Sequence, residues 1–340
     1  MTQIELQAKI TQTIWDNEKC IIAASPRSGK TKATLNALSK ISGDILISVP
    51  SEFMINIWKT ECEKWSFIDP MRLYFCCHAS LHKQPKFDTL VIDEIHSAIS
   101  EIRLEGIKQI KAKKIIGLSG SMSQKAIKIL EERLGLNIKM SYSVDQAVSN
   151  DVIKDYCIYI HEIPLLLEEQ REYDKLSRSV AWAKEQGRGK QLMFISLKRS
   201  RFLHNLKSKN TYVKKLINNF DRYLCFTQLI GVANNICEYT YNSKSGNENL
   251  ELFKEEKINS LGLTKLANEG ISFNNLDTSV IVGINSSEIS MIQRILRSMT
   301  KEEDNMLANI HVIVSKQTQE SLVWLPNALQ SFNSEKIKII

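Results

Sequence analysis

The stretch Cys20-Ile21-Ile22-Ala23-Ala24-Ser25-Pro26-Arg27-Ser28-Gly29-Lys30-Thr31 decides how the first part of this chain folds. Its apolar beginning predicts a buried strand, and the residues after it, 32–38, predict a helix. A strand, a tight loop ending in Gly-Lys-Thr and a helix make up a phosphate-binding loop. Backbone N–H groups of such a loop point at an anion, and the helix dipole favours negative charge there.

The side chains of this loop have separate expected roles. Ser28 and Gly29 lie where the backbone cradles phosphate, and Lys30 is expected to reach the β- and γ-phosphates of a nucleotide. The hydroxyl of Thr31 is expected to ligate Mg²⁺. Ala24 stands where the pattern has its first glycine, and a small residue is expected to serve because the strict need for a positive φ falls elsewhere in the loop.

Composition restricts the class of protein. With 340 residues, 43% of them hydrophobic and 24% charged, the chain has room for two compact soluble domains. No apolar run approaches the roughly 18 residues that span a bilayer, and the N-terminus lacks the features of a signal peptide. The seven cysteines form no C-x-x-C pair, which argues against structural zinc or a disulfide framework. We therefore expect a cytoplasmic protein without a membrane partner.

The net charge of +7 is unevenly distributed. Residues 171–215 contain 13 Lys or Arg but only 3 Asp or Glu. This excess predicts an element that faces a polyanion, and the alternative is an ordinary solvated helical surface. The stretch reads as helical and is interrupted at Gly187-Arg188-Gly189, so it could form a hairpin that stands off a sheet.

Short apolar runs alternate with helical stretches along the whole chain, which predicts parallel sheets covered by helices on both faces. The expected strands are 20–24, 44–49, 72–77, 88–92 and 114–118 in a first domain, and 156–162, 222–226, 236–241, 258–263, 279–284 and 310–315 in a second. The predicted domains are 1–145 and 146–340, the second with a basic helical insertion at about 165–215. A helix over 51–65, capped by Ser51, is expected to bury Trp58 and Trp65.

Two acids follow the predicted strand 88–92 directly. Because the carboxyl ends of parallel strands face the ligand crevice, Asp93 can hold Mg²⁺ through water opposite Thr31. Glu94 can orient and deprotonate the attacking water. The neighbouring Cys76-Cys77-His78 is not a metal site, because three adjacent residues cannot all face one ion.

The Gly-Lys-Thr loop followed by Asp93-Glu94-Ile95-His96 resembles the DExH group of superfamily 2 helicases and translocases. It is most similar to compact phage and bacterial members related to restriction-type and repair-type translocases. Other motifs of that group have counterparts in the expected order: Gln7 (Q motif), Val49-Pro50-Ser51 with Trp58 (Ia), 77–81 (Ib), 117–121 (III), 224–228 (IV), 264–273 (V) and 292–297 (VI).

The resemblance implies two tandem RecA-like domains that use ATP and Mg²⁺ to move along a strand, either alone or as the motor subunit of a larger assembly. It implies that Gln7 reads adenine and that motifs V and VI complete the ATP site with Gly270, Gln293, Arg294 and Arg297. It implies strand contacts by Ser51, His78, Ser80, Thr227 and Thr264. We expect Lys198, Arg199 and Arg201 of the basic stretch to hold duplex or displaced strand, with single-stranded or branched DNA as the partner.

Three departures from the family pattern bear on activity. Arg27 replaces a common glycine, Ser119-Gly120-Ser121 lacks the usual alanine, and motif VI is compressed. If Gln293 is the family glutamine, Arg297 is the first arginine; if it replaces the glycine, Arg294 and Arg297 are both family arginines, which their shared helix face favours. The alternatives to a DNA motor are an RNA helicase, a nucleic-acid-binding module with a silent ATPase, and a small-molecule kinase.

Overall fold

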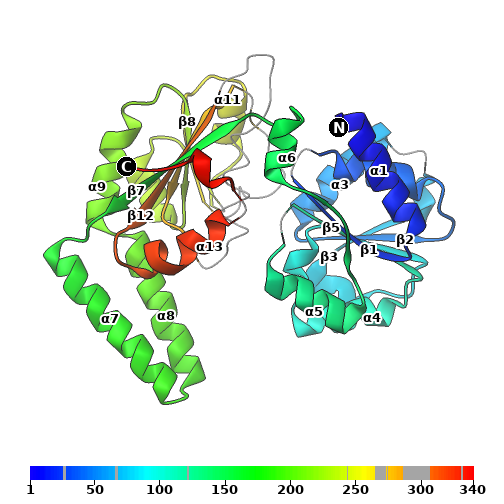
Figure 1. Cartoon of the computed structure of the whole chain (residues 1–340), viewed down its shortest axis with the longest axis horizontal. Coiled ribbons are helices and arrows are strands. Elements are labelled where there is room, and N and C mark those ends of the chain that lie inside the picture. The colour runs from blue at the N-terminus through cyan, green and yellow to red at the C-terminus, as the bar shows by residue number, and fades with distance from the viewer. Residues whose placement is uncertain are drawn as a thin grey trace. The chain divides into compact units, whose positions relative to one another are not determined.

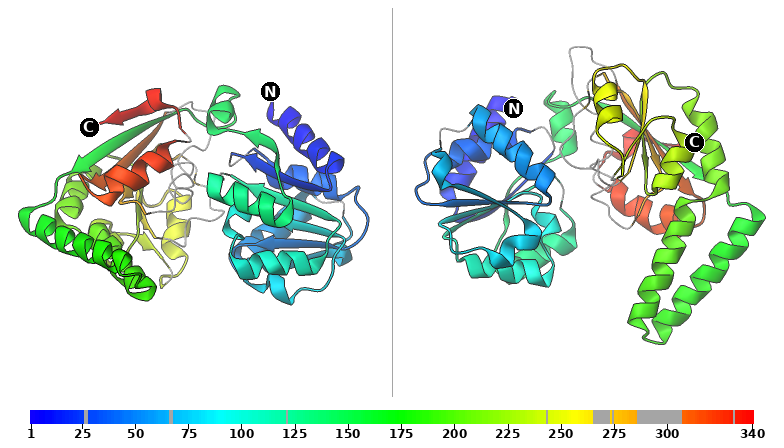
Figure 2. Two further views of the ribbon diagram at one scale, coloured as in Figure 1. Left: turned by 60° about the horizontal axis from the view of Figure 1, so that its bottom comes forward. Right: turned by 180° about the vertical axis from the view of Figure 1, so that it is seen from behind.

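The chain forms two compact α/β units, Met1–Ile153 and Lys154–Ile340 (Figure 1). The computed structural model describes residues 1–25, 28–65, 68–120, 122–242, 244–264, 273, 275–285, 307–330 and 332–340. Each unit has a parallel sheet with helices on both faces, so the predicted fold class is confirmed (Figure 2). Within the described ranges, no helix is long and apolar enough to cross a membrane.

The sheet of unit 1 has the order β3-β2-β4-β5-β1-β6, and every neighbouring pair in it is parallel. Its strands are β1 (Lys19–Ala24), β2 (Ile45–Val49), β3 (Leu73–Cys77), β4 (Thr89–Ile92), β5 (Lys114–Ser119) and β6 (Ile138–Tyr142). Its helices are α1 (Gln3–Asp16), α2 (Lys30–Leu38), α3 (Glu52–Trp65), η1 (Pro70–Arg72), η2 (His78–Lys83), η3 (Ile95–Ser97), α4 (Glu101–Ile110), α5 (Gln124–Leu134) and α6 (Val144–Ser149).

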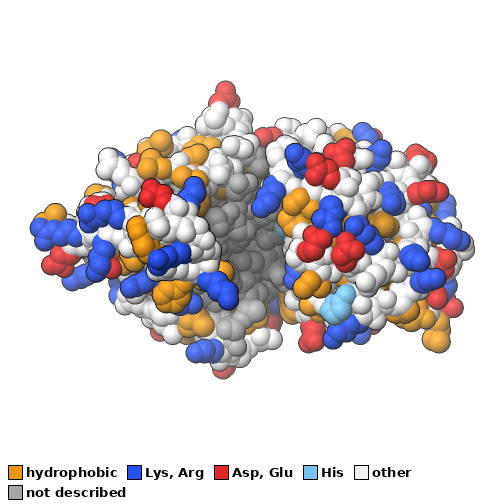
Figure 3. Space-filling model, turned by 90° about the horizontal axis from the view of Figure 1, so that it is seen from below, with side chains coloured by type: hydrophobic (Ala, Val, Ile, Leu, Met, Phe, Trp, Pro, Cys, Tyr) orange, Lys and Arg blue, Asp and Glu red, His pale blue; other side chains and the backbone are white. Residues whose placement is uncertain are grey.

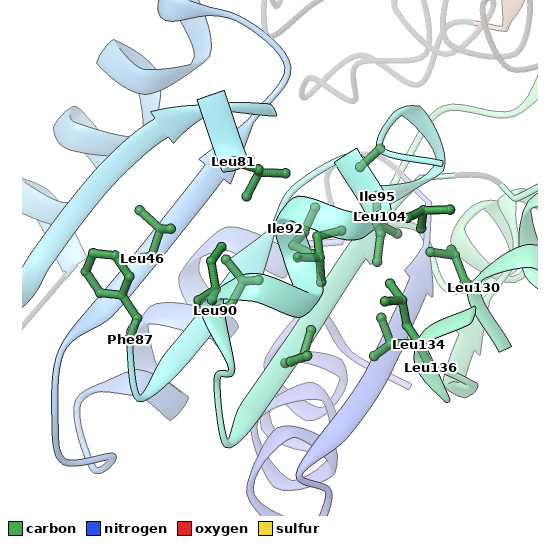
Figure 4. Close-up of a cluster of buried hydrophobic side chains, with 14 of the residues drawn as sticks. Leu46, Leu81, Phe87, Leu90, Ile92, Ile95, Leu104, Leu130, Leu134 and Leu136 are labelled. Carbon is green, nitrogen blue, oxygen red and sulfur yellow. The ribbon is translucent and has the colours of Figure 1, made fainter. Parts of the chain in front are cut away.

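A core of aliphatic side chains fixes one face of this sheet (Figure 4). Ile92 of β4 and Ile95 of η3 are fully buried in it, and both flank the acidic pair. Each buried aliphatic side chain contributes roughly 1.5–3 kcal/mol. The turn that carries Asp93 and Glu94 is therefore anchored on both sides by packed residues.

The sheet of unit 2 has the order β13-β7-β12-β11-β8-β10-β9 and is also parallel at every pairing. Its strands are β7 (Tyr156–Ile163), β8 (Tyr223–Thr227), β9 (Thr240–Tyr241), β10 (Ser260–Leu263), β11 (Thr278–Val282), β12 (Ala308–Ser315) and β13 (Ile337–Ile339). Its helices are α7 (Leu167–Glu185), α8 (Gly189–His204), α9 (Lys207–Ile217), α10 (Ile230–Ile236), α11 (Glu248–Lys254), η5 (Glu320–Trp324), α13 (Leu325–Leu329) and η6 (Ser334–Lys336).

Helices α7 and α8 form an antiparallel hairpin that projects from the body of unit 2, as Figures 1 and 2 show in green. Its base is tied to the segment after β12. Lys209 and Glu320 form an ion pair of 2.7 Å in which both side chains are almost completely buried. The backbone N–H of Gln319 donates to the hydroxyl of Tyr173 at 2.9 Å. The base is thus fixed, while the far half extends outward.

The structure differs from the expected elements in several places. Unit 1 extends to Ile153, eight residues beyond the expected boundary at 145, because β6 pairs with β1 and the next helix buries Ala147. The edge strands β6 and β13 were not predicted, and β9 is much shorter than the expected 236–241 because α10 runs to Ile236. Trp58 is buried as expected, but the expectation for Trp65 was wrong. It is 41% exposed, with the ammonium of Lys32 3.9 Å from its ring centre.

Candidate nucleotide-binding site

The loop after β1 has the backbone of an anion cradle. Gly29 has a φ of +79° and is the N-cap of α2, so the N-terminus of that helix opens onto the loop. A Cβ at Gly29 would lie 2.2 Å from Nε2 of Gln7, so the end of that side chain would have to move. The position therefore requires glycine because of its backbone angle. Gln7 packs directly on the loop, the place that the Q-motif resemblance implies.

Two serine hydroxyls in the same loop are buried without a hydrogen-bond partner. Oγ of Ser25 and Oγ of Ser28 both lack one among the described residues, although the two residues are at most 1% exposed. A buried polar group without a partner costs free energy, and such exceptions often mark sites for a ligand. Phosphate oxygens would accept from these hydroxyls, so the loop fits the group that it is expected to bind. Pro26 and Arg27 lie outside the described residues.

The ammonium group of Lys30 bonds to the loop itself. Its Nζ donates to the carbonyl oxygen of Ala24 and, at 3.1 Å, to that of Ser25. Burial lowers the pKa of Lys30, and the nearby carboxylates of Glu94 and Asp93 oppose this. A nucleotide's phosphates would supply the negative charge that this half-buried ammonium otherwise takes from carbonyl dipoles.

Asp93 is buried and held by two donors. Its Oδ2 accepts from Nε1 of Trp58 at 2.8 Å, and its Oδ1 accepts from the backbone N–H of Glu94 at 2.9 Å. Burial, reinforced by the charge of Glu94, raises the pKa of Asp93 to about 6, while the bond from Trp58 and the charge of Lys30 lower it. An ion with positive charge would remove this penalty, so the carboxylate suits a cation.

The contact between Trp58 and Asp93 was missed from the sequence. Trp58 was expected only as a core residue of its helix, yet a buried indole N–H usually finds an acceptor. Trp58 and Asp93 follow β2 and β4, which are neighbours in the sheet, and this strand order was not predicted from the sequence.

Glu94 has left-handed backbone angles, with φ and ψ both at 49°. This conformation is uncommon outside glycine and turns the chain sharply between β4 and η3. Its Oε2 lies 3.2 Å from Nδ1 of His96, which also bonds to Oγ of Ser119 at 2.8 Å. Burial lowers the pKa of His96 to about 4, so this ring is neutral at pH 7. His96 thereby links the acidic turn to the end of β5.

Thr31 and Asp93 fit Mg²⁺ better than a metal with an all-protein ligand set. The described part of the chain contains no group of three or more His, Cys, Asp or Glu that could hold a metal ion. Mg²⁺ usually takes one or two protein ligands and completes its shell with phosphate oxygens and water. Thr31 and Asp93 would hold it, and the ion would neutralise charge on the β- and γ-phosphates.

The residues of unit 1 expected to contact a strand differ in their surroundings. Ser51 and Ser80 are half-buried, next to the ends of β2 and β3. His78 is only 1% exposed, and its Nδ1 bonds to Oγ of Ser48 at 2.8 Å. Burial lowers the pKa of His78 to about 4. This imidazole therefore packs inside unit 1 and is neutral at pH 7, and its contact with a strand stays a prediction.

In unit 2, Thr227 is the last residue of β8 and Thr264 follows the last residue of β10. These two strands are neighbours in the sheet. Both residues are buried, and the hydroxyl of Thr227 donates to the carbonyl oxygen of Leu229 at 3.1 Å. The hydroxyl of Thr227 and the backbone N–H of Thr264, which donates to the carbonyl oxygen of Tyr241 at 3.4 Å, are thus engaged within unit 2. The motif V and VI residues expected at the ATP site, Gly270, Gln293, Arg294 and Arg297, lie outside the described residues.

The three basic residues expected on the hairpin are not equivalent. Lys198 and Arg201 are exposed on α8. Arg199 is half-buried and donates to Oε1 of Gln319, and at 3.4 Å to Oγ of Ser177. Lys209, which was counted in the basic excess, is buried in an ion pair with Glu320 and is not accessible to a polyanion. Of these residues, Lys198 and Arg201 therefore supply the accessible charge.

Comparison with known proteins finds similarity in part of the sequence and in the fold. Residues 189–300 match the family described as helicase conserved C-terminal domain. Over 270 residues the chain is 26% identical to a candidate helicase, helicase 22 of Sulfolobus islandicus filamentous virus (isolate Iceland/Hveragerdi). That match covers 71% of this chain and 46% of the viral protein, so the chain spans about half the length of its curated relative.

Solved structures with the same fold include three nucleic-acid enzymes. The ATP-dependent Type ISP restriction-modification enzyme LlaBIII bound to DNA has a TM-score of 0.69 and 13% identity, over 100% of this chain and 31% of that one. The Hef helicase domain of Pyrococcus furiosus has a TM-score of 0.56 and 15% identity, over 95% of this chain and 97% of that one. A variant of S. cerevisiae Dbp5 bound to RNA and ADP BeF3 has a TM-score of 0.61 and 13% identity, over 99% of this chain and 89% of that one. These likenesses establish a fold of two tandem RecA-like domains.

Proposed function

We propose that this chain is an ATP-dependent helicase or translocase that acts on DNA and couples ATP hydrolysis in unit 1 to movement along a strand. The observation that carries the proposal is the composition of one sheet edge. A phosphate-binding loop with two unpartnered buried hydroxyls lies at the carboxyl end of β1, and a buried carboxylate follows β4. A motor that binds Mg²⁺ and ATP needs both groups on one edge.

The roles of the individual residues follow from their chemistry. Lys30 and the loop N–H groups would bind the β- and γ-phosphates, while Thr31 and Asp93 would hold Mg²⁺. Glu94 would orient the attacking water and accept its proton. Its carboxylate lies beside His96 in the same turn. Arg294 and Arg297 would add positive charge that stabilises the transferring phosphoryl group, and Gly270 and Gln293 would contact the nucleotide.

The second unit supports a nucleic-acid motor rather than a small-molecule kinase. A kinase of that kind needs one sheet and an acceptor pocket, whereas this chain has a second parallel sheet matching a helicase C-terminal family. Solved structures of the same fold are bound to DNA in one case and to RNA in another. We propose DNA as the substrate, and RNA is the alternative that the experiment must exclude. We expect action in the cytoplasm, alone or within a larger assembly.

The test measures phosphate release from ATP with single-stranded DNA, duplex DNA, forked DNA or RNA as the stimulant. We expect stimulation by single-stranded or forked DNA that exceeds stimulation by RNA of the same sequence. Stimulation by RNA alone would assign the chain to RNA helicases. Tight DNA binding without any hydrolysis would identify a binding module whose ATPase is silent.

A further inference from the structure

The outward face of α8 combines apolar and basic side chains in an unusual way. Met193, Phe194 and Leu197 are 64%, 68% and 52% exposed, although large apolar side chains of this kind are usually buried. Lys190, Lys198 and Arg201 are exposed on the same helix. Spacings of three, four, seven and eleven residues place all six on one helical face, which we call the α8 strip.

The α8 strip carries no negative charge of its own, because α8 contains no Asp or Glu. Figure 3 shows Lys and Arg side chains with hydrophobic side chains between them over the part of the molecule that carries the hairpin. Near the hairpin turn, the guanidinium of Arg188 lies 4.5 Å from the ring centre of Trp182, which is 43% exposed. An apolar strip lined by cations fits an anion that also presents flat apolar faces.

The hairpin also has the rigidity that a docking element needs. At its base, Glu169 of α7 accepts from the Ser208 hydroxyl at 2.6 Å, and Tyr173 and Leu203 are buried together. The apolar side chains of the strip, Met193, Phe194 and Leu197, lie between this anchored base and the hairpin turn and are exposed, so they are not required to hold the helices together. Exposed apolar residues that the fold does not need mark a surface for a partner.

We propose that the α8 strip binds single-stranded nucleic acid, with Phe194, Met193 and Leu197 contacting unpaired bases and Lys190, Lys198 and Arg201 contacting the flanking phosphates. This inference rests on the proposed function and deepens it. The sequence predicted only basic residues as contacts, and the α8 strip adds apolar residues that contact the bases. Base stacking on an exposed ring contributes with any sequence, because every base has a π-face. Bases of a duplex are already stacked and paired, so the strip would distinguish the open strand from the closed one.

The test measures binding of the full chain to a short fluorescent single-stranded DNA without nucleotide, so it does not depend on ATP hydrolysis. Phe194→Ala should weaken binding roughly 5- to 150-fold, the range for loss of one base–aromatic stack. The salt dependence of the binding constant should stay the same, because no charge is removed. Phe194→Tyr keeps a ring and should bind nearly as well as the wild type. Ile102→Ala removes a side chain that is 70% exposed on α4 and is the matched control.

Two further arms decide between partners. With a blunt duplex of the same sequence, Phe194→Ala should cause a smaller loss than with the single strand, and an equal loss in both would overturn the proposal. Vesicles containing phosphatidylserine test a lipid surface, and binding to vesicles that depends on Phe194 without any effect on the single strand would also overturn it. If the wild type binds DNA through Phe194 but hydrolyses no ATP, the proposed function is wrong, whereas the proposal that the α8 strip binds single-stranded nucleic acid is supported.

A second inference rests on a different contact, the hydrogen bond from Trp58 to Asp93. Trp58 belongs to α3, which starts at Glu52, directly after the predicted strand contact Ser51. Its indole is 1% exposed and its N–H has Oδ2 of Asp93 as acceptor at 2.8 Å. One helix therefore connects a residue expected to touch the strand with the carboxylate expected to hold Mg²⁺.

We infer that Trp58 is a positioning residue, which fixes the orientation of the Asp93 carboxylate. Trp58→Phe keeps the ring and removes the donor. It should raise the concentration of Mg²⁺ that half-saturates ATP hydrolysis about 10-fold or more, because hydrogen bonds to charged groups contribute about 1.5–3 kcal/mol. Trp65→Phe, on the exposed side of the same helix, is the control.

A direct titration of the carboxyl separates this role from a merely structural one. Carbon-13 spectra of labelled aspartate, assigned with Asp93→Asn, should show a higher pKa for Asp93 in Trp58→Phe than in the wild type. An unchanged titration together with an unchanged need for Mg²⁺ would refute the inference. A wild type that hydrolyses no ATP would refute the proposed function, and the titration would still decide the role of Trp58.

Discussion

The sheet edge of unit 1 and the hairpin of unit 2 place their charges in opposite ways. At the sheet edge, Asp93 is 8% exposed and its partners are fixed side chains and backbone groups. On the hairpin, Lys198 and Arg201 are open to water and stand beside exposed apolar side chains. Buried charges have large, specific effects, whereas exposed charges act weakly and collectively. The first region suits the chemistry of one small ligand, and the second suits a long flexible polyanion.

The largest effect is expected from the most enclosed cation of the sheet edge. Lys30→Ala should lower ATP hydrolysis about 100-fold or more, because it removes charge that stabilises the transferring phosphoryl group. Lys32→Ala, on the same helix, removes an ammonium that lies over the ring of Trp65 and should keep most of the activity. Rates of phosphate release at saturating ATP and Mg²⁺ provide the measurement. Equal losses in the two variants would remove the distinction between the lysine of the phosphate-binding loop and the lysine beside Trp65.

A buried charge at the base of the hairpin should matter more for stability than any charge on its surface. Lys209→Met leaves Glu320 buried without its ammonium partner, and breaking such a pair costs about 3–5 kcal/mol. The double variant Lys209→Met with Glu320→Leu should recover much of this loss, since no charge then remains in the apolar site. Scanning calorimetry of the full chain measures the transition of unit 2. A single variant as stable as the wild type contradicts this account of the hairpin base.

Acid should inhibit hydrolysis through Asp93. Its pKa is raised to about 6 and only the carboxylate binds a cation, so activity and Mg²⁺ affinity should fall as the pH drops below about 6. The effect on stability has the opposite sign. A carboxyl whose pKa is higher in the folded state favours folding most at low pH, and this contribution is lost as the pH rises through about 6. Rates between pH 5 and 8 at a fixed Mg²⁺ concentration that half-saturates the wild type at pH 8 check the first statement, and a flat profile contradicts it.

The smallest effects are expected on the hairpin surface. Lys198→Gln and Arg201→Gln should each reduce the slope of log binding constant against log salt by about 0.7, the value for one phosphate contact on a single strand. Arg199→Gln should reduce it less, because this guanidinium already donates to Gln319. Titrations of a labelled single strand at several salt concentrations measure the slopes. Three equal changes would mean that the bonds of Arg199 do not restrain it.

The two regions also differ in how far the sequence predicted them. The phosphate-binding loop was recognised because Gly29 is required by local geometry, and the strand before Asp93 because a continuous apolar run has few alternatives. Contacts between distant residues were not predicted. Neither the Trp58–Asp93 bond nor the Lys209–Glu320 pair has a local signature, because each depends on which strands become neighbours.

Local patterns also failed where tertiary packing decides exposure. Trp65 has the helical spacing of a core residue but lies at the end of α3, beyond the part that packs on the sheet. The charge excess of 171–215 predicted the hairpin surface, yet it counted Lys209, which is buried. The exposed Met193, Phe194 and Leu197 look like an ordinary helical core face in the sequence, and only the structure shows that no described residue of unit 2 covers them.

The most direct test of the account is the rate of ATP hydrolysis as a function of single-stranded DNA concentration, measured for the wild type and for Lys30→Ala. The account predicts a wild-type rate that rises with DNA and saturates, and a Lys30→Ala rate that stays near the background at every concentration. A wild-type rate that is independent of DNA, or a Lys30→Ala rate that rises as steeply as that of the wild type, would contradict it.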